Sequence, residues 1–246
     1  MRYPVLLFDL FRTILMFTPQ APTGQVKEPT WRTAMGALRG RAAPLLGDIE
    51  FDFFLDALYD VSVLIAKARA PEHREVPIEE RYTRALARLG CEGAAAAATG
   101  TLLAHLQLEA QAANTELPPA HGALLRELAR THRLAVVSNF DHSATAQALL
   151  ARHGLDEVLT TAVVSIDFGR RKPHPAIFLE AVRRLDATPA MALFVGDSLG
   201  DDVNGARAAG IDSAWINWSA APLPADGPQP TYTIGALTEL CRVLDE

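Results

Sequence analysis

Three carboxylates follow one apolar segment within six positions of one another. The segment 192–195 leads through Gly196 into Asp197, Asp201 and Asp202. Acidic side chains this close repel one another unless a cation lies among them, and their oxygen atoms suit a hard divalent ion. The alternative for Asp197 is that it caps the helix that follows. The spacing favours a divalent metal site over a cap.

A fourth carboxylate, Asp9, follows the apolar run 3–8 near the start of the chain. In an open α/β sheet the carboxyl ends of the strands face the ligand crevice, so a polar residue at that point is exposed to substrate. Taken alone, this Asp could equally be a turn or cap residue. Two more segments favour the chemical interpretation, one that repeats this pattern and one that presents a lysine just before a helix.

The first of these segments is Ser138 with Asn139, which ends the apolar run 134–137, and the second is Lys172 in the turn-rich basic loop 169–175. A helical pattern begins directly after that loop. In simpler interpretations Ser138 is a strand-end turn residue and Lys172 is a solvated loop charge. Asp141, which follows closely, is expected to cap the next helix.

Taken together, the four segments resemble the four ordered motifs of the haloacid dehalogenase superfamily: Asp9–Thr13, Ser138–Asn139, Lys172–Pro173 and Gly196–Asp202. The resemblance covers roughly the first fifteen residues and everything from about residue 118 onward. It implies an α/β fold, with a Rossmann-like parallel sheet in a catalytic core of residues 1–16 and 118–246. Residues 17–117 resemble the helical cap that one branch of this superfamily inserts after the first motif.

The resemblance also implies roles for individual residues. Asp9 would be the nucleophile that forms a covalent aspartyl intermediate. The Mg²⁺ ligands would be Asp9, the backbone carbonyl of Phe11, Asp197 and one of the pair Asp201 and Asp202. Family spacing favours Asp202 as the ligand. Asp201 would then support the site or cap the next helix. Ser138 and Asn139 would bind oxygens of the transferring group, and Lys172 would neutralise charge and orient Asp9.

Two residues depart from the family pattern, Phe11 and Arg12. Phosphatases of this superfamily usually carry a second Asp at the position of Phe11, which protonates the leaving group and then activates water. Losing such a general acid and base typically costs about 10²- to 10⁴-fold in rate. Arg12 stands where glycine is common, and it either forms a structural salt bridge or binds a substrate anion.

Three functions therefore compete. Retention of Asp197 and Asp202 favours Mg²⁺-dependent hydrolysis of a phosphomonoester, with a small phosphorylated metabolite as substrate. The aromatic Phe11 favours metal-independent dehalogenation of a 2-haloacid or another carbon-centred hydrolysis, since dehalogenases of this fold carry an aromatic residue there. Phe11 and Arg12 together would also suit a catalytically weakened protein that binds a phosphorylated ligand.

The elements that must position these residues can be read from periodicity. Apolar residues recur at three- and four-residue spacing from Trp31 to about residue 108, which predicts a four- or five-helix insert. The residues Trp31, Phe53 and Phe54 are expected to pack between helices. Segment 18–29 is expected to be a linker or a loop over the site. From residue 118 helices and strands alternate, with one helix expected over 201–209, as in a parallel sheet covered on both faces.

Composition excludes several classes of protein. The net charge is −6 with scattered basic residues, so a nucleic-acid partner is not expected. No apolar run is long enough to span a bilayer, and no signal segment is evident, which makes a cytoplasmic location the default expectation. Cys91 and Cys241 are expected to be buried, reduced thiols. Spare apolar surface on the helical insert could support a homodimer.

Overall fold

The computed structural model describes residues 2–18, 21, 31–70 and 72–245, which form two compact units. The core unit comprises Met1–Met16 and Glu116–Glu246, and the helical unit comprises Phe17–Thr115. The chain passes between the units through the short paired strands β2 (Met16–Phe17) and β3 (Thr115–Glu116). Each unit is described below by itself.

The core unit contains a six-stranded sheet in which every strand pairing is parallel, which confirms the predicted α/β class. The spatial order is β5-β4-β1-β6-β7-β8. The strands are β1 (Val5–Phe8), β4 (Arg133–Ser138), β5 (Thr161–Val164), β6 (Ala192–Gly196), β7 (Asp212–Ile216) and β8 (Tyr232–Ile234). Strand β1 is central, and its four apolar side chains are fully buried, as expected for a strand covered on both faces.

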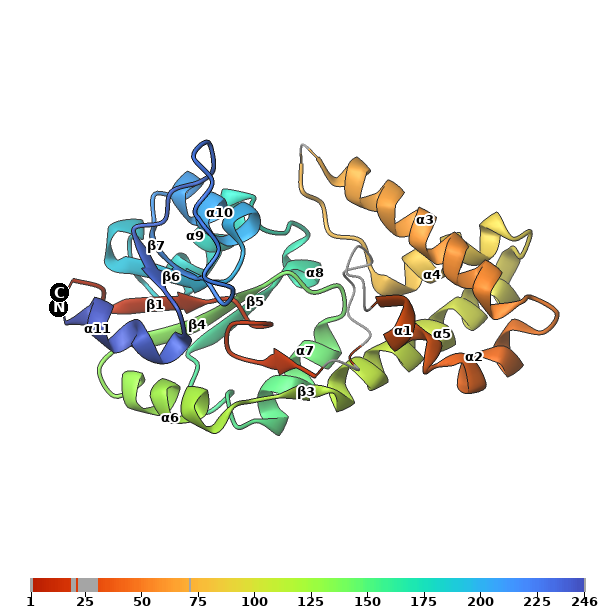
Figure 1. Ribbon diagram of the computed structural model, residues 1–246, viewed down its shortest axis with the longest axis horizontal. Coiled ribbons are helices and arrows are strands. Elements are labelled where there is room, and N and C mark those ends of the chain that lie inside the picture. Colours follow the sequence, from red (N-terminus) through yellow and green to blue (C-terminus); the bar gives the residue numbers. More distant parts are fainter. Residues whose placement is uncertain (1, 19–20, 22–30, 71, 246) are drawn as a thin grey trace. The chain divides into compact units, whose positions relative to one another are not determined.

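Helices cover both faces of this sheet (Figure 1), with α9 (Pro175–Arg184) and α10 (Asn204–Ala208) on one side and α6 (Pro119–Leu128) and α11 (Leu240–Leu244) on the other. An apolar cluster joins the first pair to the sheet through Val5, Val137, Phe178 and Phe194. Burying each such side chain contributes roughly 1.5–3 kcal/mol. The remaining elements of the unit are α7 (Ser143–Arg152), α8 (Ser165–Phe168), η1 (Pro189–Met191), η2 (Leu199–Val203) and η3 (Leu237–Glu239).

Helix capping in the core unit differs from the sequence-based predictions. The N-cap of α7 is His142, whose Nδ1 accepts from the backbone N–H of Thr145 at 3.2 Å, so the prediction that Asp141 caps this helix was wrong. A ring nitrogen can accept this hydrogen bond as a carboxylate would, and a histidine is not an obvious cap in a sequence. His174, expected to be a loop residue, caps α9 in the same way.

The single helix expected over 201–209 is instead two elements, the π-helical turn η2 and the helix α10. The Ser198 hydroxyl, rather than Asp201 or Asp202, caps this turn by accepting from the Asp201 N–H at 3.1 Å. The two cysteines also differ from expectation: both are free, but Cys91 is only partly buried and Cys241 is exposed. Burial of either thiol was therefore predicted wrongly.

The described residues of the helical unit form five helices: α1 (Trp31–Gly36), α2 (Arg39–Leu46), α3 (Phe51–Arg69), α4 (Ile78–Arg88) and α5 (Gly93–Ala113). Trp31 and Phe54 are buried as expected, but Phe53 is 65% exposed, so its predicted packing role was wrong. Among the described residues, no helix has both the length and the apolar character needed to cross a membrane. The predicted linker 18–29 lies almost entirely outside the described residues.

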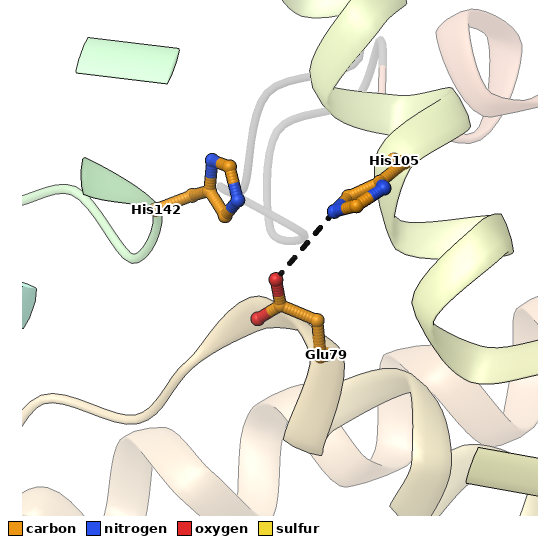
Figure 2. A group of neighbouring side chains, drawn as sticks. All are labelled: Glu79, His105 and His142. Atoms are coloured by element: carbon orange, nitrogen blue, oxygen red, sulfur yellow. Dashed lines mark ion pairs between the residues drawn. The ribbon is translucent and has the colours of Figure 1, made fainter. Parts of the chain in front are cut away.

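Polar contacts link the two helices α4 and α5 of this unit. The Tyr82 hydroxyl donates to Gln107 Oε1 at 2.5 Å, and both side chains are buried. Nearer the surface, His105 Nε2 lies 3.8 Å from Glu79 Oε1, the pair marked by the dashed line in Figure 2. Buried polar groups of this kind are stable only when paired, so the Tyr82 contact helps to fix the register of the two helices.

Candidate active site

The predicted site residues come together at the carboxyl edge of the core sheet. Asp9 follows β1, Ser138 ends β4, and Asp197 follows β6. Phe8 of β1 pairs with Val136 of β4 and Val195 of β6, so the three site residues leave the sheet within one residue of the same level. The backbone N–H of Asp9 donates to Val195 O at 2.9 Å and extends the pairing by one residue. The topology therefore gathers residues that are far apart in the sequence.

Lys172 bridges two carboxylates in the interior of this site. Its Nζ lies 2.5 Å from Asp9 Oδ1 and 2.7 Å from Asp202 Oδ1. The Lys172 side chain is only 2% exposed, so the solvated-loop alternative is excluded by the structure. An ammonium group this deeply buried needs charged partners, and two carboxylates supply them. The ion pair fixes the orientation of the Asp9 carboxylate.

Three carboxylates form a group with suitable geometry for a metal ion. Asp9, Asp197 and Asp202 each offer an oxygen atom, and these atoms all lie within 4.8 Å of one another. Asp201 is not in this group; its Oδ2 accepts from Asn139 Nδ2 at 3.2 Å. Oxygen-only donor sets suit Mg²⁺, so the chemistry of this group fits that ion.

The turn after β6 determines where Asp202 points. Asp202 Oδ2 accepts from the backbone N–H of Ser198 at 2.9 Å, which holds the carboxylate back over the end of the strand. A Cβ atom on Gly196 would lie only 2.3 Å from that oxygen. Glycine is therefore required at this position by close approach of the Asp202 side chain.

Burial and mutual repulsion shift the pKa values of the acids. Burial raises the pKa of Asp9 to about 7, with Asp202 and Asp197 adding to the rise and Lys172 opposing it. Burial and Asp202 similarly raise the pKa of Asp197 to about 6, against the charges of Arg12 and Lys172. Burial alone would lower the pKa of Lys172, but Asp202 and Asp9 raise it above its ordinary value. A further cation beside the acids would favour their ionised forms.

Two buried hydroxyl groups near this edge lack a protein partner. Ser138 Oγ and Thr13 Oγ1 are fully buried, and neither has a hydrogen-bond partner among the described residues. Buried hydroxyls are usually hydrogen-bonded, so each such group calls for an explanation such as a ligand or water. Ser138 was a predicted site residue. Thr13 was part of the first motif but had no predicted role.

Asn139 connects the second and third motifs. Its Oδ1 accepts from the Lys172 N–H at 2.7 Å, and its Nδ2 donates to the Lys172 carbonyl at 3.1 Å. These two contacts hold the loop that carries Lys172 against the end of β4. The peptide bond Lys172–Pro173 in this loop is cis. The side chain of Asn139 thus supports Lys172 through its backbone.

The two unusual residues of the first motif have distinct surroundings. The Phe11 ring packs against Phe140, with centroids 4.9 Å apart. Arg12 Nε lies 3.0 Å from Asp197 Oδ2 and forms an ion pair with it. Arg12 was expected either to form a structural salt bridge or to bind a substrate anion, and the structure shows the salt bridge.

Two aromatic residues that the sequence did not single out hold the loop of the first motif. Trp218 Nε1 donates to the Arg12 carbonyl at 2.8 Å, and His121 Nδ1 lies 3.0 Å from the Ile14 carbonyl. Their rings stack with centroids 6.3 Å apart. They come from distant segments with no motif of their own, so no local signal could have identified them.

With this geometry established, comparison with known proteins gives the family. The model of the haloacid dehalogenase-like hydrolases matches residues 65–210, more than half of the chain. The chain belongs to this family, which confirms the resemblance identified from the sequence. The match includes the second, third and fourth motifs.

Curated relatives match part of this chain. A glyceraldehyde 3-phosphate phosphatase from Methanopyrus kandleri is 44% identical over 100 residues, covering 39% of this chain and 43% of the relative. The chain spans about half the length of the curated relatives it matches, 43%, 55% and 57% in three cases.

Two crystal structures resemble the whole chain. One is a 2-haloacid dehalogenase from Pseudomonas syringae pv. Tomato DC3000, with a TM-score of 0.75 and 26% identity over 99% of this chain and 98% of that one. The other is the putative HAD-hydrolase YfnB from Bacillus subtilis bound to magnesium, with a TM-score of 0.65 and 25% identity over 100% of both chains.

Proposed function

We propose that this protein is a Mg²⁺-dependent hydrolase of phosphomonoesters that acts through an aspartyl-phosphate intermediate. The observation that carries the proposal is the group of Asp9, Asp197 and Asp202, whose oxygens lie within 4.8 Å of one another. A metal-independent reaction at carbon has no need for this concentration of negative charge. The phosphatase name of the Methanopyrus kandleri relative supports the same choice.

In the proposed reaction an Asp9 oxygen forms a bond to phosphorus while the bond from phosphorus to the alcohol oxygen breaks. The alcohol leaves with one proton. A water molecule then attacks the aspartyl phosphate, restores the carboxylate and releases inorganic phosphate. Lys172, 2.5 Å from Asp9, holds the carboxylate in one orientation throughout.

Other residues would bind the phosphoryl group. The unpartnered Ser138 hydroxyl is suited to donate to a phosphoryl oxygen. Asn139 would act mainly through its two contacts with the Lys172 backbone, with substrate binding as its further predicted role. A magnesium ion would be held by Asp9, Asp197 and Asp202, which the donor set fits, with the Phe11 carbonyl as a further predicted ligand. Bound there, Mg²⁺ supplies the positive charge that offsets repulsion between the nucleophile and the phosphate.

Protonation of the leaving group must differ here from the usual reaction of phosphatases in this family. Phe11 cannot donate a proton, so we propose that the substrate has a good leaving group or takes its proton from solvent. We further propose that the helical unit, Phe17–Thr115, serves as the cap that selects a small phosphorylated metabolite, with the core unit as the catalytic domain.

The test is phosphate release from a broad panel of phosphomonoesters, with and without Mg²⁺. Asp9→Asn, which keeps shape but removes the charge, is the matched inactive variant. We expect release that requires both the metal and Asp9. Tight binding of phosphorylated compounds with no turnover in either form would instead indicate a ligand-binding protein.

A second candidate function, 2-haloacid dehalogenation, is favoured by Phe11 and by the Pseudomonas syringae structure. In that reaction an Asp9 oxygen would displace halide from carbon, and water would cleave the resulting ester. Halide release from 2-haloacids in the presence of EDTA distinguishes it from the phosphatase. Activity of this kind, with none on phosphomonoesters, would replace the first proposal.

A further inference from the structure

An arginine pairs with one of the carboxylates of the proposed metal site. Arg12 Nε lies 3.0 Å from Asp197 Oδ2, and Asp197 is one of the three grouped carboxylates. The Arg12 side chain is 44% exposed, whereas that of Asp197 is largely buried. The guanidinium group therefore reaches from the solvent side onto a carboxylate that a divalent ion would also use.

The backbone fixes Arg12 in this position. Its φ is +65°, a left-handed conformation that is uncommon for residues other than glycine. The Arg12 N–H donates to Leu15 O at 2.6 Å, and its carbonyl accepts from Trp218 Nε1 at 2.8 Å. Unfavourable backbone conformations persist where the surrounding structure holds them, and they cluster at functional sites. The main chain at Arg12 is thus anchored on both sides of its Cα atom.

Every carboxylate of the group already has a protein cation beside it. Lys172 is shared by Asp9 and Asp202, and Arg12 pairs with Asp197. The three negative charges are therefore offset by two positive ones before any metal binds. A divalent ion that enters must share Asp197 with the guanidinium group and overcome repulsion from it.

We propose that Arg12 competes with the divalent ion for Asp197 and so sets the affinity of the site for metal. The inference rests on the proposed Mg²⁺ site, but it concerns a residue outside the ligand set. It predicts that removing the Arg12 charge strengthens metal binding. If Arg12 instead only held Asp197 in place for the metal, its removal would weaken metal binding.

The experiment is isothermal titration calorimetry of the 246-residue chain with MgCl₂ alone, which requires no substrate or turnover. We expect Arg12→Gln to bind Mg²⁺ about tenfold more tightly than the wild type, a modest effect for one unit charge a few ångströms away. Arg12→Lys, which keeps the charge, should stay within about threefold of the wild type. Arg2→Gln is the matched control, because Arg2 pairs with Asp212, the first residue of β7, at the amino-terminal end of that strand.

Further variants separate the possible failures. Asp202→Asn should abolish Mg²⁺ binding both in the wild type and in Arg12→Gln. Arg12→Gly is a second variant that removes the charge, and glycine adopts the left-handed conformation at this position without strain. If the wild type binds Mg²⁺ but neither charge-removing variant binds more tightly, the inference is overturned and the proposed function stands. If no form binds Mg²⁺ at millimolar concentration, the proposed metal dependence fails and the inference fails with it.

Discussion

One ion-paired group from each unit shows two different environments for a charged side chain. In the core unit, Lys172 is 2% exposed and contacts two carboxylates, Asp9 after the central strand β1 and Asp202 in the turn after β6. In the helical unit, Arg41 pairs with Glu109 at 2.7 Å, but their side chains are 58% and 62% exposed. Burying the charges of the first arrangement costs desolvation free energy, whereas the second arrangement is an ordinary feature of a protein surface.

The difference shows that the unfavourable burial of charge occurs at the candidate active site. Burial, with repulsion from neighbouring carboxylates added to it, raises the pKa of Asp9 to about 7 and that of Asp197 to about 6. A solvated ion pair between helices contributes at most about 1 kcal/mol to stability. The contrast can be tested by altering the two units in matched ways.

The largest effect is expected for Lys172→Met. This substitution removes the cation and leaves Asp9 and Asp202 buried without their partner, which should lower the free energy of unfolding by about 3–5 kcal/mol. Activity should also be lost, because the Asp9 carboxylate is no longer oriented. Chemical denaturation and phosphate release measure the two effects. Arg41→Met is the control, and an equal loss of stability in both variants would refute the contrast between the units.

A second comparison uses two glycines that both face a close neighbour. A Cβ on Gly196 would lie 2.3 Å from Asp202 Oδ2, and one on Gly100 would lie 2.8 Å from Thr83 Oγ1. Each alanine substitution should cost about 1–3 kcal/mol of stability through overpacking. Only Gly196→Ala should lower kcat/KM, by about 10²-fold, since it displaces a proposed metal ligand. A comparable kcat/KM loss in Gly100→Ala would show that the helical unit also shapes the chemistry.

The sequence predicted the core sheet well because its strands are continuous apolar runs that end in polar residues. Such runs are buried on both faces, and their carboxyl ends converge wherever the sheet is parallel. Asp9, Ser138 and Asp197 were therefore placed at one edge correctly from pattern alone, while their chemical roles stay predictions. The helical insert was similarly recognisable from three- and four-residue spacing.

Contacts between distant segments could not be predicted in this way. Neither Trp218 nor His121 belongs to a motif, yet both hold the first-motif loop through backbone carbonyls. The exposure of Phe53 was missed for a related reason, since periodicity assigns a residue to a helix but does not state which neighbours cover it. Capping by His142 was missed because several side chains can accept the same backbone N–H.

A third prediction concerns metal binding and stability. A divalent ion that binds the folded core should stabilise it by RT ln(1 + [L]/Kd), about 2.7 kcal/mol at a concentration one hundred times Kd. Thermal denaturation with increasing MgCl₂ measures this rise, and EDTA should reverse it. Asp202→Asn should remove the response, whereas Glu109→Gln in the helical unit should retain it. A response that persists in Asp202→Asn would place the ion outside the grouped carboxylates.

The smallest effect is expected for the Arg41–Glu109 pair itself. A double-mutant cycle with Arg41→Gln and Glu109→Gln should give a coupling energy of about 0–1 kcal/mol, because water screens both charges and ordering the long side chains costs entropy. Denaturation at low and at about 1 M salt should show that most of this coupling disappears at high salt, where the screening length is about 3 Å. A coupling that exceeds this range and resists salt would mean that the pair behaves like a buried one, and its contrast with the ion pairs of Lys172 would then fail.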